Sequence, residues 1–224
     1  MTARIARPTA KEMSIAVACL VLAVGGAFLA ASLTQDKPIF TLAPPGGTPE
    51  DVFREDQRLN LHRTFFTAWA TLILVTPALC TFLFRRTSEI AARYWQAFWT
   101  VSFIAFVVHF IWAVSVLFQS DWGRILDAHK RVSEPIWDTV VAAWWGLDVL
   151  LAWLVRDERL WIRIQRVVVH AAVFVLFFVG SAKEGELKLS TALGGALGGA
   201  VLTSFVIWLA RWLKQPKGGA APAV

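Results

Sequence analysis

Six long apolar runs, separated by shorter polar segments, make up most of this chain. Each run has about the 20 residues that an α-helix needs to cross the hydrocarbon of a bilayer. Backbone polar groups in lipid must be satisfied within their own segment, so helices are the expected form. The sequence therefore predicts an all-α, polytopic integral membrane protein with a six-helix transmembrane domain over residues 13–213. Its spans cover residues 13–33, 64–84, 94–118, 136–155, 162–182 and 189–213.

The longest polar segment, residues 34–63, follows the first span. It begins with several prolines and glycines, which predict an irregular loop. Thr48 is then followed by Pro49 and by acidic residues, which suit the N-cap, the first position and the first turn of a helix. We expect an outer helix from about Pro49 toward Leu61, running into the second span.

The remaining polar segments are shorter. Residues 1–12 form a basic N-terminal segment, and the run that follows is longer than the apolar core of a signal peptide, so we interpret it as a span. Residues 119–135 contain the pattern of a short helix lying at the membrane surface, and Pro135 suits the start of the fourth span. Residues 214–224 lack periodicity and are expected to be disordered.

Composition and charge support membrane insertion and give an orientation. Hydrophobic residues make up 57% of the chain and charged residues 17%, against about 45–50% and 25% in soluble domains. The net charge is +6, but the basic residues flank the spans, so nucleic acid is not a predicted partner. Lys and Arg are more frequent in residues 1–12, 85–93, 156–166 and 211–224 than in the alternate segments. The positive-inside rule then places both termini in the cytoplasm and the protein in the cell inner (plasma) membrane.

Aromatic residues add a second marker of the membrane boundary, because Trp and Tyr favour the interface. Trp95 and Trp153 are among the residues expected at the inner interface, whereas Trp122 and Trp137 are expected at the outer one. Trp144 and Trp145 fall near the middle of the fourth span instead. We expect them to face other helices or a ligand.

Small residues form two ridges that predict close helix packing. Glycines four residues apart lie on one helix face and let another backbone approach. The sixth span has two such pairs, and the first span has alanines at the same spacing, so these helices are expected to pack on each other or on another protein. The packing residues are Gly194, Gly195, Gly198, Gly199, Ala23, Ala27 and Ala31. Pro77 is expected to kink the second span.

Three ionisable residues inside the spans are the candidate site. A central Asp costs about 2.5–3.5 kcal/mol on insertion scales, so it needs a partner or a function. Counting residues outward from the turn between the fourth and fifth spans places Asp148 at a depth that Arg166 and His170 flank on the fifth span. We predict an Asp148–Arg166 ion pair, with His170 one turn deeper. It is either a bridge that locks two helices or a cytoplasmic pocket for protons or an anionic group.

His109 lies in the outer half of the third span, at the predicted level of Trp144 and Trp145. A haem between His109 and His170 is unfavourable, because the two side chains differ in depth by about 10 Å. Metal binding by His109 with His62 or His129 stays open, although no pair has metal-ligand spacing. No residue pattern identifies a cofactor, a catalytic centre or a metal site.

Three classes of function remain. The first is a non-catalytic membrane subunit or scaffold that docks through small-residue and Trp-rich helix faces. The second is a transport or substrate-binding subunit with a pocket lined by Asp148, Arg166, His170, His109, Trp144 and Trp145. The third is a membrane enzyme that acts on a lipid or quinone or carries a redox cofactor. The expected partners are the lipid bilayer, other membrane subunits and a hydrophobic small molecule.

Overall fold

The computed structural model describes residues 5–34, 58–127, 135–155, 159–183 and 188–214. Within these ranges, six helices are long and apolar enough to span a membrane, as the sequence predicted. They are α1 (Ala10–Thr34), α2 (Arg58–Phe82), α3 (Glu89–Ile111), α5 (Pro135–Leu154), α6 (Leu160–Phe178) and α7 (Lys188–Leu213). Two are prolonged by π-helical turns, α3 by η3 (Trp112–Leu117) and α6 by η5 (Val179–Lys183).

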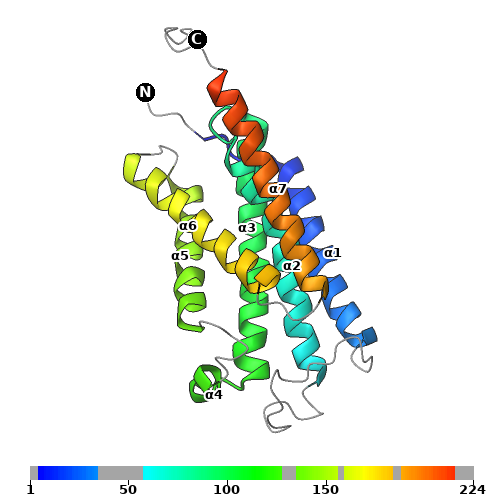
Figure 1. Cartoon of the computed structure of the whole chain (residues 1–224). Coiled ribbons are helices and arrows are strands. Elements are labelled where there is room, and N and C mark those ends of the chain that lie inside the picture. Colours follow the sequence, from blue (N-terminus) through cyan, green and yellow to red (C-terminus); the bar gives the residue numbers. More distant parts are fainter. Residues whose placement is uncertain (1–4, 35–57, 128–134, 156–158, 184–187, 215–224) are drawn as a thin grey trace.

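Successive long helices run in opposite directions (Figure 1). One end of the bundle holds the start of α1, the α2–α3 turn, the end of α5, the start of α6 and the end of α7; we call it the terminal end. The opposite end carries the short helix α4 (Trp122–Asp127), and we call it the α4 end.

Helices α2 and α3 form the centre of the bundle. Helix α1 packs against both of them, α5 packs against α3 and α6, and α7 packs against α2 and the α6–η5 segment. The main core is aromatic and β-branched, with Val75, Trp99, Trp145 and Val173 all fully buried.

Several predicted polar segments can be compared with the structure. The short helix after the third span is present as α4, and Pro135 begins α5. Most of the predicted outer helix lies outside the described residues, as do residues 1–4, His129 and residues 215–224 of the predicted disordered tail. The described part, from Arg58 onward, is helical and continues without interruption through Pro77.

The N-terminal segment lies against the bundle at the terminal end. Glu12 caps the start of α1, because its carboxylate accepts both the Thr9 N–H and the Thr9 hydroxyl. Ile5 packs on the main core, and the Arg7 guanidinium donates to the Trp153 carbonyl at 2.6 Å. The segment therefore connects the start of α1 to the end of α5.

The two small-residue ridges have different neighbours. On α1, Ala27 and Ala31 are buried, and Ala23 is half-buried. On α7, Gly194 is buried and Gly198 faces Phe178, because a Cβ added at Gly198 would stand 2.5 Å from that ring. Helix α1 has its principal contacts with α2, whereas α7 contacts both α2 and the α6–η5 segment.

Candidate functional site

Asp148 of α5 and Arg166 of α6 form a buried ion pair. The Arg166 Nε lies 3.3 Å from the Asp148 Oδ1, and neither side chain has any solvent-exposed surface. The pair forms because α5 and α6 are antiparallel neighbours, so positions equally far from their connecting turn meet at one depth. The ion pair that the sequence predicted is therefore present.

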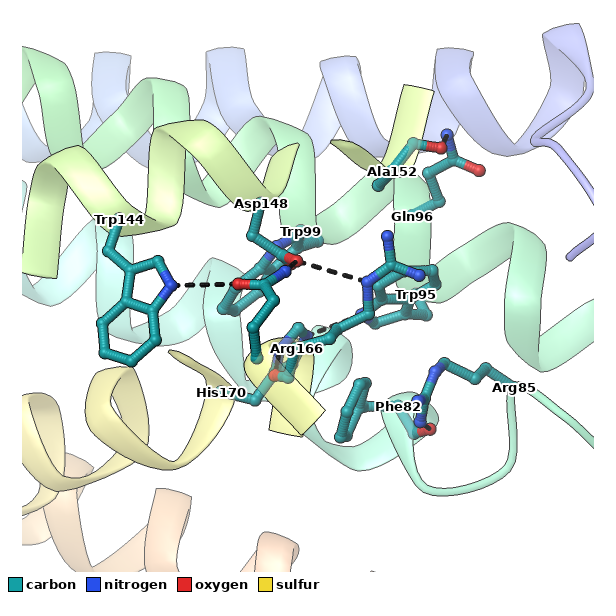
Figure 2. Close-up of polar contacts among 11 residues, drawn as sticks. Phe82, Arg85, Trp95, Gln96, Trp99, Trp144, Asp148, Ala152, Arg166 and His170 are labelled. Atoms are coloured by element: carbon teal, nitrogen blue, oxygen red, sulfur yellow. Dashed lines mark hydrogen bonds and ion pairs between the residues drawn. The ribbon is translucent and has the colours of Figure 1, made fainter. Parts of the chain in front are cut away.

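The Asp148 carboxylate has two further donors (Figure 2). The Trp99 Nε1–H of α3 donates to Oδ2 at 2.9 Å, and the Gln165 amide of α6 donates to Oδ1. The Gln165 Oε1 in turn accepts the Trp144 Nε1–H at 2.9 Å. Gln165 thus links Trp144 to the ion pair, and three helices contribute to one hydrogen-bonded network.

His170 lies one turn further along α6, and its two ring nitrogens have opposite roles. Its Nε2 accepts the Trp95 Nε1–H at 2.8 Å, while its Nδ1 lies 2.7 Å from the Arg166 carbonyl oxygen. A carbonyl only accepts, so Nδ1 carries the proton and Nε2 is bare. The geometry fixes the neutral imidazole, because a second proton on Nε2 would meet the Trp95 N–H.

The His170 ring is also held between two aromatic rings. Its centroid lies 3.8 Å from that of Phe82 and 3.7 Å from that of Trp99, with interplanar angles of 16° and 14°. The Arg85 guanidinium lies over the other face of Phe82, 3.7 Å from its centroid. This stack of Arg85, Phe82, His170 and Trp99 runs from the α2–α3 turn toward Asp148. We use the name polar cluster for the hydrogen-bonded residues around the ion pair and His170: Trp95, Trp99, Asp148, Gln165, Arg166 and His170.

The two mid-span tryptophans of α5 face other helices. Trp145 is fully buried and packs on Trp99, Phe106 and Phe177. Its Nε1–H has no hydrogen-bond acceptor among the described residues. Trp144 is half-buried, and its indole N–H is the one that bonds Gln165.

His109 lies apart from the polar cluster. Its Nδ1 lies 2.9 Å from the Thr64 carbonyl oxygen and 3.3 Å from the Thr67 Oγ1, both on α2. His170 stacks on Trp99, which precedes His109 by ten residues, or about 15 Å along α3. The structure therefore does not bring His109 into one pocket with Asp148, and the two histidines are too far apart in depth to share a haem.

The arrangement is suited to holding helices together rather than to chemistry on a ligand. Each residue of the cluster forms at least one hydrogen bond within the same chain, and Trp95, Trp99, Asp148 and Arg166 have no exposed surface. Among the described residues, no group of three or more His, Cys, Asp or Glu side chains is placed to hold a metal ion. The chain matches no protein-family model, no curated protein and no solved structure.

Three members of the cluster were missed by the sequence analysis: Trp95, Trp99 and Gln165. Trp95 was expected at the membrane interface, but it is fully buried and bonded to His170. That prediction was wrong because a Trp near the end of a span can also donate its N–H inside the bundle. The repeat Trp95, Trp99, Ser102 and Phe106 follows helical spacing, and this signal was available in the sequence.

Proposed function

We propose that this protein is a non-catalytic integral membrane subunit or scaffold that docks onto other membrane subunits through the outer face of α7. It lies in the cell inner (plasma) membrane as a multi-pass protein with both termini in the cytoplasm. Support for the orientation comes from the terminal end, where Arg7, Arg86, Arg159 and Arg211 lie beside the ends of the spans.

The polar cluster supports a structural role for the intramembrane charges. A binding or proton-transfer site needs groups that a ligand or water can reach. Asp148 and Arg166 are completely buried and bonded within the bundle, and His170 has both nitrogens engaged. In a bilayer, this pairing and hydrogen bonding offset part of the cost of the buried charges and connect α3, α5 and α6.

The observation that carries the proposal is the second glycine pair of α7. Gly195 and Gly199 are exposed, and no atom of a neighbouring helix in the described ranges lies within 4 Å of where a Cβ would stand. The same face continues through Leu202 and Val206, which are 63% and 55% exposed. We call these four residues the outer ridge.

A small-residue ridge with bulky apolar residues beyond it is the surface that membrane helices use to associate. Between helices in lipid, attraction comes from close van der Waals packing, because lipid tails are as apolar as leucine. Two glycines four residues apart allow a second backbone to approach, which increases that contact. The inner pair, Gly194 and Gly198, already serves the protein's own packing, so the outer ridge is the one left for a partner.

The test is native mass spectrometry after extraction in gentle detergent, on the wild type and on a Gly195→Leu/Gly199→Leu variant. The wild type is expected to retain a second membrane subunit, or a second copy, that the variant loses. Gly25→Leu is the matched control, since Gly25 is an exposed helical glycine with equally open space on α1. A wild type without any protein partner, or a complex that survives in the double variant, would contradict the proposal.

An alternative function has one observation in its favour. A groove of about 300 Å³ lies between α1, α2 and α7, and its walls include Ala23, Gly26, Phe66 and Trp69. It has the apolar lining expected of a site for a hydrophobic small molecule, which is the partner of a transport or substrate-binding subunit. The same mass spectra test it: a retained small molecule lost on Gly26→Leu replacement would favour this alternative.

A further inference from the structure

A cavity of about 180 Å³ lies at the α2–α3 turn, separate from the polar cluster and from the groove. It is lined by Ile5 and Ala6 of the N-terminal segment, by the turn residues 85–88, and by Glu89 and Ala92 of α3. The turn joins the end of one candidate span to the start of the next. In an inserted protein the cavity therefore opens at the membrane surface.

Two arginines make the cavity cationic. Arg85 is only 7% exposed and is held in place, because its guanidinium stacks on Phe82 and its Nη1 donates to the Phe82 carbonyl at 2.8 Å. Arg86 is exposed and also lines the cavity. Guanidinium groups match phosphate oxygens in geometry and charge, and they bind phosphate more strongly than a neutral donor does.

The Ser88 hydroxyl and the neighbouring charges favour the same ligand. The Ser88 Oγ accepts the Ala91 N–H, and its own O–H has no acceptor among the described residues. The one acid in the lining, Glu89, is paired with Arg93 at 3.2 Å, which offsets its repulsion of an anion. Arg211 of α7 adds another positive charge nearby, over the ring of Phe84.

We propose that this cavity binds a phosphate group, presented either by the headgroup of an anionic phospholipid or by a free phosphate ion. Its position at the membrane surface and its arginines are what phosphate recognition between transmembrane helices requires. The site is independent of docking through α7. It adds a small-molecule or lipid ligand to the proposed subunit role.

The experiment measures binding to the purified full-length protein by native mass spectrometry and by the shift in thermal midpoint. Phosphatidylglycerol, phosphatidylcholine and inorganic phosphate are the three probes. Wild-type protein is expected to retain phosphatidylglycerol over phosphatidylcholine, and Arg86→Gln to weaken that binding about tenfold, the loss expected for one charge-assisted hydrogen bond. Glu89→Gln is expected to strengthen it.

Arg159→Gln is the matched control, since it removes the same charge from another exposed position at the terminal end. Selective retention of phosphatidylglycerol supports the lipid source, and a shift with inorganic phosphate alone supports the free ion. Equal losses in Arg86→Gln and Arg159→Gln would mean that overall charge causes the binding, which would overturn the site. Absence of binding by all three probes in folded wild-type protein would overturn it too.

Discussion

The polar cluster and the outer ridge of α7 differ in how far their residues are buried and bonded within the bundle. The cluster contains an ion pair, hydrogen bonds from two indoles and one amide, and a neutral imidazole, and its Asp148, Arg166, Trp95 and Trp99 have no exposed surface. The outer ridge has no polar side chain, and nothing in the described ranges lies within 4 Å of where a Cβ would stand at its two glycines. One region is complete without a partner, and the other presents an unused packing surface.

The difference follows from what lipid tolerates. An unsatisfied charge in hydrocarbon costs several kcal/mol, so a chain that carries Asp148 must supply its partners during its own folding. An open apolar surface costs little, because lipid chains cover it. Specific association in the membrane can therefore be left to small-residue surfaces, while polar groups are used for internal packing. Four predictions test this contrast, from the largest expected effect to the smallest.

The largest effect is expected for Asp148→Asn. The amide keeps the size of the carboxylate, but its NH2 group would meet the donor of Trp99 or those of Gln165 and Arg166, and the buried Arg166 loses its counter-charge. Breaking a buried ion pair by removing one partner costs about 3–5 kcal/mol. Unfolding in mixed detergent, followed by circular dichroism, is expected to show a loss of stability of that size.

A double-mutant cycle separates the pair from its surroundings. Adding Arg166→Gln to Asp148→Asn removes the uncompensated charge, so the double variant is expected to be more stable than the sum of the single changes predicts. If Asp148→Asn were fully stable and only a cellular activity were lost, the cluster would be a functional pocket and the contrast with the outer ridge would fail.

The two glycine pairs of α7 give the second prediction. A Cβ at Gly198 would stand 2.5 Å from the Phe178 ring, which stacks on Phe174, so Gly198→Ala is expected to destabilise by about 1–3 kcal/mol. Gly195→Ala meets nothing, and helix propensity alone is expected to stabilise by up to about 1 kcal/mol. Thermal unfolding in detergent measures both, and Phe178→Leu should rescue Gly198→Ala. Equal effects at the two positions would mean that α7 has no distinct inner and outer face.

His170→Phe is the third prediction. A phenyl ring keeps the stack between Phe82 and Trp99 but accepts no hydrogen bond from Trp95. Leaving that buried N–H without an acceptor is expected to cost about 1–2 kcal/mol. Equilibrium unfolding of His170→Phe and of the double variant with Trp95→Phe measures the loss, and the double variant should recover part of it. A fully stable single variant would show that stacking, not hydrogen bonding, holds this part of the cluster.

The spans and the ion pair were predictable from the sequence for simple physical reasons. Spans are long and uniformly apolar. Where a short turn joins two antiparallel helices, residues at equal distances from the turn lie at the same depth in the membrane. Asp148 and Arg166 could be matched in this way. The same counting placed His109 at the level of Trp144 but gave no rotation about the helix axis, and in the structure His109 bonds α2 instead.

The other cluster members needed information that spacing does not carry. Trp95 and Trp99 are as compatible with a lipid interface as with a buried donor, and only the position of His170 and Asp148 on a neighbouring helix decides between these roles. Gln165 is uncharged, so it did not stand out as costly, although it bridges Asp148 and Trp144. Likewise, the sequence shows two glycine pairs on α7 but not which one faces Phe178.

The smallest effect is expected at the edge of the cluster, for Trp144→Phe. Trp144 is half-buried, and its indole N–H makes one hydrogen bond to Gln165, which keeps its bond to Asp148 when the indole is removed. Hydrogen bonds between membrane helices contribute about 0.6 kcal/mol on average, and the phenyl ring retains most of the apolar contact.

Unfolding in mixed detergent is therefore expected to show a loss below about 1 kcal/mol for Trp144→Phe, measured beside Leu147→Ala as an exposed change on the same helix. A loss as large as that of Asp148→Asn would show that the network acts as one cooperative unit up to its edge. A graded loss from Asp148 through His170 to Trp144 would instead mean that the buried charge makes the largest contribution to the stability of the cluster and that the surrounding hydrogen bonds make smaller, separate contributions.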